Sequence, residues 1–265
     1  MPQSAQAILE VKDLSMAFGG IQALDNLDLD VHGGEIVALI GPNGAGKTTF
    51  FNCVTGLYKP TGGDVLLTPP GRKTSRLNGL KPNVIAKKGM ARTFQNIRLF
   101  QNMTVLENVM IGRHCRTRAF VFGAIFRPPQ TRREEQDIVD RSYAILEKVG
   151  LAHVVNDFSK NLSYGQQRRL EIARALATEP SLLLLDEPAA GMNPQETHEL
   201  EQLIQRIRDE GHAVLLIEHD MKLVMSLSDR VYVMDYGKRI AAGSPEEVSA
   251  DPAVIKAYLG ESDDA

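Results

Sequence analysis

The segment from Gly41 to Thr49, GPNGAGKTT, constrains this chain more than any other part of its sequence. It fits the pattern G-x-x-x-x-G-K-[ST] without a mismatch, and the apolar run at residues 35–40 before it predicts a buried strand. Residues 48–55 predict a helix that ends near Gly56. A glycine loop between a strand and a helix brings backbone N–H groups together where the helix dipole favours anions. The segment therefore predicts a phosphate-binding loop.

Every residue of this loop is a candidate nucleotide ligand. Glycine has no Cβ, so the backbone can wrap closely around a phosphate. We expect the Lys47 ammonium to reach the β- and γ-phosphates and the Thr48 hydroxyl to bind Mg²⁺. The candidate nucleotide-binding residues of the loop are Gly41, Pro42, Asn43, Gly44, Ala45, Gly46, Lys47, Thr48 and Thr49.

The composition limits the kind of protein that carries this loop. Of the 265 residues, 24% are charged and 43% hydrophobic, which is typical of a soluble globular protein with an ample core. The net charge of −3 argues against a nucleic-acid-binding protein, which usually has a basic excess. The chain has no apolar run long enough to span a membrane and no secretory signal pattern. We expect Cys53 and Cys115 to be reduced thiols of a cytosolic protein that reaches membranes only through a partner.

The hydrophobic pattern predicts an α/β fold. Residues 8–31 alternate between apolar and polar, which indicates antiparallel strands with one solvated face. Short apolar runs at 181–185, 213–217 and 230–234 alternate with helical patterns such as 196–209. This alternation is typical of a parallel sheet that is covered by helices on both faces.

The middle of the chain, residues 84–176, is predicted to be mostly helical. The expected fold class is a P-loop NTPase core with a parallel sheet, an N-terminal antiparallel β subdomain and an inserted helical subdomain. The expected boundaries are 1–95 for the β subdomain and the first part of the core, 96–176 for the helical subdomain, and 177–265 for the second part of the core with the C-terminal helix and tail.

A hydrophobic strand ends in two acids at residues 182–188, LLLLDEP. The ends of strands in open α/β sheets are where ligands bind. Asp186 is placed to hold Mg²⁺ through water, and Glu187 is placed to polarise the water that attacks a phosphate. The same pattern also fits a buried strand with two acids at an exposed edge, but the phosphate loop favours the catalytic interpretation.

Residues 162–167, LSYGQQ, precede a predicted helix at 168–178 and contain a candidate N-cap, Ser163. The order of phosphate loop, glutamine, LSYGQQ, LLLLDEP and a histidine after a strand resembles the ATP-binding subunits of ABC transporters, whose signature sequence is usually LSGGQ. Within that family, residues 162–194 are similar to the branched-chain amino acid transport ATPases. The resemblance covers residues 9–260.

The resemblance implies roles for residues outside the phosphate loop. Phe18 matches the aromatic residue that stacks on adenine, although it also fits a core aromatic. Gln95 matches the glutamine that contacts Mg²⁺ and water beside the helical lobe, and His219 matches the histidine that contacts the γ-phosphate. Ser163 and Gly165 match the signature residues that contact phosphate. The candidate catalytic residues are Glu187, His219 and Gln95, and the candidate metal ligands are Thr48, Gln95 and Asp186.

Two positions depart from the family pattern. Tyr164 replaces one glycine of the signature sequence, which makes the helix entry less flexible. Asn193 stands where many members have aspartate. In those members the aspartate carboxylate contacts the second ATP-binding subunit, so that contact is in doubt for this chain.

The resemblance also implies partners. In the family, two ATP-binding subunits form a head-to-tail dimer, in which Ser163 and Gly165 of one subunit would close on the ATP held by Lys47 of the other. The second subunit is either another copy or a related ATPase. Two membrane permease subunits, and indirectly an extracytoplasmic solute-binding protein, complete the expected assembly. No nucleic acid is expected, and the chain would lie peripherally on the cytoplasmic face of the inner or plasma membrane.

The expected function is ATP hydrolysis in an ABC importer for branched-chain amino acids or related small solutes. The alternative is a soluble ABC-type ATPase of DNA repair or translation, but those often carry two cassettes or a long coiled coil, and this chain has neither. Glu187 argues against a non-hydrolysing regulator. The solute stays open, because the ATPase does not touch it.

The run Ala119–Phe126, AFVFGAIF, is unusually apolar and flanked by arginines. It fits either a segment buried in the helical lobe or a contact with a partner or membrane surface. We expect permease loops to dock in a groove near Gln95.

Overall fold

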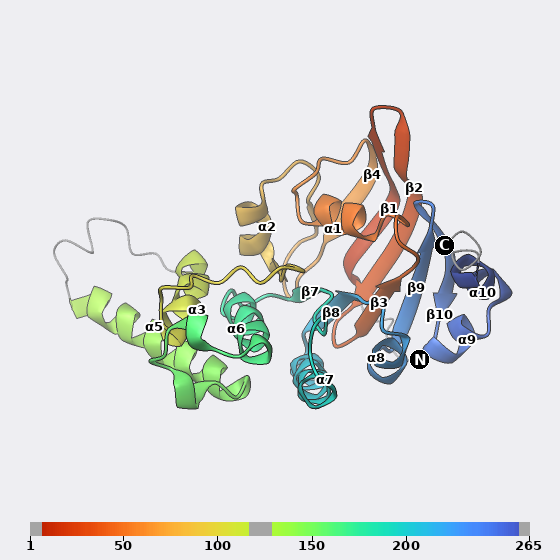
Figure 1. Ribbon diagram of the computed structural model, residues 1–265. Helices are drawn as coiled ribbons and strands as arrows, with labels where there is room; N and C mark the ends of the chain where they lie inside the picture. Colours follow the sequence, from red (N-terminus) through yellow and green to blue (C-terminus); the bar gives the residue numbers. More distant parts are fainter. Residues whose placement is uncertain (1–6, 117–128, 260–265) are drawn as a thin grey trace, which may run out of the picture.

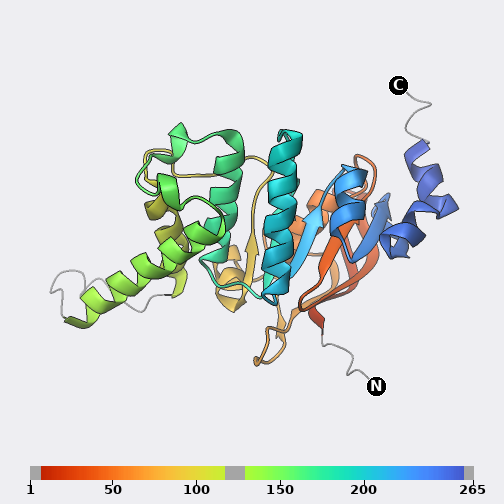
Figure 2. The same cartoon turned by 90° about the horizontal axis from the view of Figure 1, so that it is seen from below.

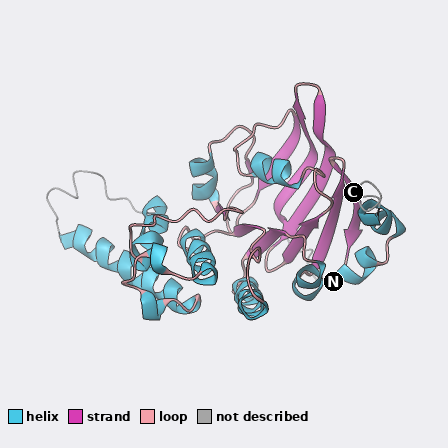
Figure 3. Cartoon of the chain, viewed as in Figure 1, coloured by secondary structure: helices cyan, strands magenta, loops and turns pink. Residues whose placement is uncertain are grey.

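The computed structural model describes residues 7–116 and 129–259, and the run Ala119–Phe126 lies outside them. Figures 1 and 3 show two sheets on one side of the molecule and a helical lobe on the other. The strands are β1 (Ala7–Phe18), β2 (Ile21–His32), β3 (Ile36–Ile40), β4 (Gly62–Leu67), β5 (Ser75–Arg76), β6 (Met90–Arg92), β7 (Leu182–Asp186), β8 (Ala213–Ile217), β9 (Arg230–Asp235) and β10 (Lys238–Gly243).

The helices connect and cover these strands. They are α1 (Lys47–Val54), α2 (Pro82–Lys88), α3 (Val105–Arg113), α5 (Pro129–Lys148), α6 (Tyr164–Leu176), α7 (Pro194–Asp209), α8 (Met221–Leu227), α9 (Pro245–Ser249) and α10 (Pro252–Leu259). Short 3₁₀ turns follow α3 and α5, at His114–Arg116, Ala152–Val154 and Ser159–Asn161. No helix of the described ranges is both long enough and apolar enough to cross a membrane.

The antiparallel sheet has the order β2-β1-β4-β5. Its central pairing joins Leu9 to Val31 and Val11 to Leu29, and these residues are all buried. The alternation in residues 8–31 therefore gives the predicted antiparallel strands with one solvated face. The strands are longer than the sequence pattern indicates, because register shifts between Val11 and Leu14 let the pairing continue past its irregular positions.

The second sheet has the order β10-β9-β3-β8-β7-β6, and all its pairs are parallel except β9 with β10. Every residue of β3, β7 and β8 is buried, as expected for strands covered on both faces. Strand β6 is an element that the sequence analysis did not predict, since residues 84–176 were expected to be mostly helical. Three residues are too few to show a strand period, and only their pairing with β7 reveals them.

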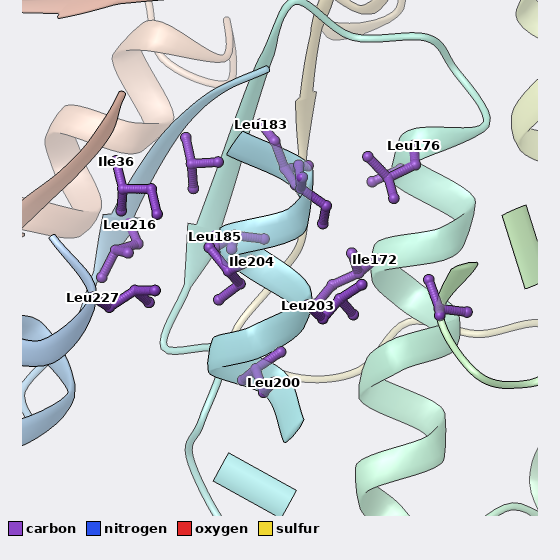
Figure 4. Packing of buried hydrophobic residues seen from close by; sticks show 14 of the residues in the cluster. Ile36, Ile172, Leu176, Leu183, Leu185, Leu200, Leu203, Ile204, Leu216 and Leu227 are labelled. Atoms are coloured by element: carbon purple, nitrogen blue, oxygen red, sulfur yellow. The ribbon is translucent and has the colours of Figure 1, made fainter. Parts of the chain in front are cut away.

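Two hydrophobic clusters hold these layers together. One fills the space between the two sheets and includes Phe50 and Phe51 of α1, which are fully buried. The other lies on the opposite face of the parallel sheet, where Leu203 and Ile204 of α7 pack between β7 and the α6 residue Ile172 (Figure 4). Figure 2 shows α7 between α6 and α8.

The helical lobe is formed by α3, α5 and α6, which pack against one another. Its helix starts are fixed by side-chain caps: Thr104 caps α3 and Ser163 caps α6, each in a reciprocal capping box. The predicted N-cap role of Ser163 is thus confirmed. The lobe leads back to the sheet directly through β7.

Candidate nucleotide-binding site

Four neighbouring parallel strands, β3, β8, β7 and β6, end at the same edge of the sheet. The phosphate loop, residues 41–49, follows β3, and His219 follows β8. Glu187 directly follows β7, and Gln95 lies shortly after β6. Crevices at the carboxyl ends of parallel strands are the usual ligand sites of such sheets. The fold therefore collects four separately predicted features at one edge.

The N-terminus of α1 differs from those of most other helices in the described parts of the chain. Its N-cap, Gly46, has a left-handed backbone (φ 102°) and makes no side-chain cap, whereas α3, α6, α7, α8 and α9 all have one. No side chain at the N-cap position therefore competes for the start of α1, and the helix dipole makes this position favourable for phosphate.

The start of the phosphate loop is packed against β9. Gly41 has φ 149°, and a Cβ at this position would overlap the carbonyl oxygen of Met234. Gly44, at the exposed part of the loop, also has a positive φ of 79°, but a Cβ there would meet nothing within 4 Å. The loop is thus fixed on its sheet side and open on the other.

This packing predicts different stabilities for two alanine variants. Gly41→Ala is expected to lower the free energy of unfolding by about 3–5 kcal/mol, because it adds a steric overlap to an unfavourable φ. The matched control Gly44→Ala meets no neighbour and is expected to cost only about 1–2 kcal/mol. Urea unfolding of both variants measures the difference. Equal losses would show that the contact with Met234 does not fix the loop.

The Lys47 side chain lies over the phosphate loop. Its Nζ donates to the carbonyl oxygens of Gly41 at 2.5 Å and Pro42 at 2.8 Å. These bonds direct the ammonium back across the open face of the loop. Thr48, the next residue of α1, is exposed. Both groups are therefore placed where a bound phosphate would meet them.

The three candidate catalytic residues lie together. Gln95 Nε2 donates to Glu187 Oε2 at 2.8 Å, and His219 Nδ1 lies 4.0 Å from the same oxygen. Glu187 has a left-handed backbone, φ 45°, which is unusual for a residue with a Cβ. Its N–H is bonded to the carbonyl of Ile217 at the end of β8. This backbone conformation, fixed by the bond to Ile217, directs the Glu187 carboxylate toward Gln95 and His219.

Asp186 is buried at the end of β7 and pairs with Arg92, an arginine that the sequence analysis gave no role. Arg92 Nη2 donates to Asp186 Oδ2 at 2.7 Å, and its Nη1 donates to Asn52 Oδ1 of α1 at the same distance. The guanidinium also lies 5.3 Å from the ring centre of Phe51. The partner charge offsets the cost of burying the Asp186 carboxylate and fixes its orientation. No sequence signal joins the two residues, because only the pairing of β6 with β7 brings them together.

A second residue to which the sequence analysis gave no role, Glu218, lies behind the catalytic group. It is 1% exposed and accepts from the N–H groups of Ala189 at 3.0 Å and His219 at 3.2 Å. Burial raises the pKa of Glu218 above its ordinary value. The residue ties the segment after β7 to the one after β8. The sequence signal that could have identified Glu218 is its position, because it is a charged residue between a predicted buried strand and the candidate residue His219.

Phe18 lies at the end of β1 and is 42% exposed, so the alternative that it is a core aromatic is wrong. Its ring meets Tyr58 edge-on, with ring centroids 5.3 Å apart. Gly46 of the phosphate loop packs closely on Ala23 of the adjoining strand β2, so this hairpin borders the loop. The exposed ring is available for stacking.

The signature turn, residues 162–165, contacts other parts of the chain than its own phosphate loop. The side chain of Ser163 accepts from the N–H of Gln166, and a Cβ on Gly165 would lie 2.5 Å from Glu196 Oε1 of α7. Asn193 caps α7 and accepts from the N–H of Glu196 at 3.0 Å. Asparagine and aspartate cap helices equally well, so the departure at this position keeps α7 capped.

A groove of about 470 Å³ separates the helical lobe from the sheet. Leu57, Ile85 and Arg92 line its sheet side, and Phe100, Ile111 and Cys115 line its helical side. Phe94, the neighbour of Gln95, lies between them and also lines the groove. We call this surface the lobe groove. Its lining is largely apolar and it reaches within one residue of the catalytic group.

Comparisons with known proteins agree with this geometry. The sequence profile of the family described as ABC transporter matches residues 24–190, and that of the branched-chain amino acid ATP-binding cassette transporter matches residues 238–264. The high-affinity branched-chain amino acid transport ATP-binding protein LivG of Escherichia coli K12 is 49% identical over 97% of this chain and 100% of its own length. BraF of Pseudomonas aeruginosa, which has the same description, is 48% identical over the same shares.

Solved structures extend the comparison. An ABC transporter cassette in its ADP conformation superposes with a TM-score of 0.83, at 32% identity, over 97% of this chain and 100% of its own. A dimeric cassette bound to ADP and phosphate has a TM-score of 0.73 and 26% identity, over 89% of this chain and 98% of its own. The α/β fold class, with its antiparallel subdomain and helical insertion, is that of these cassettes.

Proposed function

This chain belongs to the ABC transporter family of ATP-binding cassettes, and from that premise we propose that it hydrolyses ATP to power uptake of branched-chain amino acids or related small solutes through partner permeases. The observation that carries the proposal is the convergence of the phosphate loop, Gln95, Glu187 and His219 at the ends of four adjacent strands. The relatives are described as branched-chain amino acid transport proteins, which supports this solute class. A DNA-repair or translation ATPase is not favoured.

In this proposal the cassette binds ATP between Phe18 and the phosphate loop. The Phe18 ring stacks on adenine, and the N–H groups at the start of α1 hold the phosphates. Lys47 exchanges its bonds to the loop carbonyls for bonds to the β- and γ-phosphates, since ionic hydrogen bonds to phosphate are stronger than those to neutral carbonyls. The remaining loop residues shape this pocket.

The donor set suits Mg²⁺, a hard cation that takes oxygen ligands and is usually held by one or two carboxylates together with substrate phosphates. Thr48 offers a hydroxyl at the first turn of α1, Asp186 a carboxylate fixed by Arg92, and Gln95 an amide oxygen. When bound, Mg²⁺ supplies positive charge that neutralises the phosphates. These three residues are the ones that would hold it.

For hydrolysis, Glu187 takes the proton of the attacking water while Gln95 keeps the carboxylate oriented through its 2.8 Å hydrogen bond. His219, beside Glu187, contacts the γ-phosphate. Phosphoryl transfer depends mainly on such positioning and on charge stabilisation. The backbone of Glu187 and the buried Glu218 hold these groups from behind.

The active unit is a head-to-tail dimer with a second ATP-binding subunit, either another copy or a related chain. Ser163 and Gly165 of the partner subunit then complete the site around the γ-phosphate. The signature turn of this chain contacts α7 rather than its own phosphate loop, which supports a role in the opposite site. A related cassette is known as a dimer with ADP and phosphate.

Two permeases complete the assembly at the cytoplasmic face of the membrane, with an extracytoplasmic solute-binding protein as an indirect partner. Their cytoplasmic loops dock in the lobe groove, whose apolar lining suits a helical segment of a partner. We assign residues 1–95 and 177–265 to the ATP-binding core with its β subdomain and 96–176 to the helical subdomain, so the groove lies between these units.

Purification from membranes with the neighbouring subunits intact tests this proposal. Two multi-spanning permeases are expected to co-purify with the chain, and ATP is expected to be hydrolysed by the complex. Recovery of ribosomes or DNA with the chain would contradict the transporter assignment.

The same preparation tests the docking site through its two thiols. Cys115 lines the lobe groove, whereas Cys53 is buried in α1, where burial raises its pKa to about 11. A maleimide at pH 7.5 should label Cys115 of the isolated subunit and spare Cys53, because a protonated, buried thiol is inert. In the complex, labelling of Cys115 should fall at least about tenfold. Unchanged labelling of Cys115 would place the permeases elsewhere.

A further inference from the structure

Tyr164, which replaces a glycine of the family signature, contacts Arg168 of its own helix α6 and Gly191 of the turn before α7. It is the first residue of α6 and is 43% exposed. Its hydroxyl accepts from Arg168 Nη2 at 3.2 Å, and its ring centre lies 5.8 Å from the Arg168 guanidinium. A Cβ on Gly191, in the turn before α7, would lie 3.3 Å from the ring. Tyr164 therefore joins the signature turn to Arg168 and to the segment after β7.

Arg168 is fully buried and donates to two successive backbone carbonyls. Nη1 donates to the carbonyl of Phe94 at 2.7 Å, and Nη2 donates to the carbonyl of Gln95 at 2.8 Å. Nη1 also pairs with Glu171 Oε2 at 3.1 Å. A buried guanidinium with this many partners is costly to displace, so it holds the backbone firmly.

Glu171 binds the N–H groups of the same backbone segment. Its Oε1 accepts from the N–H groups of Phe94 and Arg98, each at 3.4 Å. Burial is the largest influence on the pKa of Glu171 and raises it, while Arg168 opposes that rise. Two charged residues, one turn apart on α6, thus hold residues 94–98. We call Tyr164, Arg168 and Glu171 the α6 clamp.

The clamp leads to the catalytic group. The backbone carbonyl of Gln95 is held by Arg168, and the side chain of Gln95 is bonded to Glu187 at 2.8 Å. A displacement of α6 relative to the sheet therefore moves Gln95 with it. In contrast, the phosphate loop and Phe18 have no bond to the clamp among the described residues.

We propose that Tyr164 is a positioning residue that, through Arg168, couples the place of the signature turn to the place of Gln95 beside Glu187. The inference rests on the proposed function, in which the signature turn of this chain serves the ATP site of the opposite subunit. The clamp then links the two ATP sites through one chain. Tyrosine supplies what the usual glycine cannot, an acceptor for Arg168 and a ring that packs against Gly191.

Hydrogen exchange of the isolated, nucleotide-free subunit tests the first link. Tyr164→Phe removes the acceptor and keeps the ring, and Tyr164→Ala removes both. We expect the amides of residues 94–98 to exchange about threefold faster in the first variant and about tenfold faster in the second. Tyr143→Phe, an exposed tyrosine of α5, is the matched control. Exchange equal to wild type in both Tyr164 variants would overturn the proposal.

ATPase kinetics of the complete transporter test the second link. Tyr164→Phe is expected to lower kcat about threefold and to leave the KM for ATP unchanged, because the phosphate loop keeps its geometry. In a Gln95→Ala background the same substitution should have no further effect on kcat, because the Gln95 side chain that links the clamp to Glu187 is then absent. A full additional threefold loss in that background would overturn the proposal. The exchange experiment needs no ATP, so failure of the proposed function is distinguished from failure of the clamp.

Discussion

Replacing Glu187 by glutamine is expected to lower ATP turnover by about 10²–10⁴-fold while the affinity for ATP stays within about twofold of wild type. Glutamine keeps the size of the side chain and can still bond Gln95, but it cannot accept a proton from water. The phosphate loop and Phe18, which carry most of the binding, are unchanged. Single-turnover hydrolysis and equilibrium binding of ATP separate the two effects.

The matched control for this variant is Glu246→Gln, an exposed acid in the first turn of α9. Its turnover should equal that of wild type. Near-normal turnover of Glu187→Gln would remove Glu187 as the base and move that role to another group at the same edge, such as His219.

Replacing Lys47 by alanine is expected to weaken ATP binding on the order of 100-fold. The variant loses the ammonium that would bond the β- and γ-phosphates, and each such charge-assisted bond contributes about 1.5–3 kcal/mol. The carbonyls of Gly41 and Pro42 lose a donor as well, so the free energy of unfolding is measured alongside binding. Calorimetric titration with ATP gives the dissociation constant.

Lys59→Ala removes an exposed lysine of the same charge from the segment after α1 and is the matched control. Its ATP affinity should not change. If Lys47→Ala bound ATP as tightly as this control, the phosphate loop would not be the principal nucleotide site of the chain.

The sequence was sufficient for those parts of the fold that depend on local patterns. The apolar runs of β3, β7 and β8 are covered on both faces, so their hydrophobicity alone identified them. The phosphate loop depends on residues that adjoin along the chain. The short strand β6 could not be predicted, because its three residues become a strand only by pairing with β7.

The support of the site could not be predicted for a related reason. Arg92 and Asp186 are 94 positions apart, and Arg168 and Gln95 are 73 apart, so their contacts depend on strand order and on how the helical lobe packs. The resemblance to a family supplied those candidate residues that local patterns do not reveal: Phe18, Gln95, Ser163, Gly165 and His219. It did not supply a reason for Tyr164, which differs from the family pattern and is explained by its contacts with Arg168 and Gly191.

Solute uptake by proteoliposomes that contain the complete transporter tests the central claim most directly. With ATP enclosed on the cassette side, and with the solute-binding protein outside, wild-type vesicles are expected to accumulate labelled leucine, isoleucine or valine. Vesicles with Glu187→Gln are expected to bind ATP and accumulate none. Uptake at the wild-type rate by the Glu187→Gln vesicles would contradict the account, because solute movement would then not depend on hydrolysis at this site.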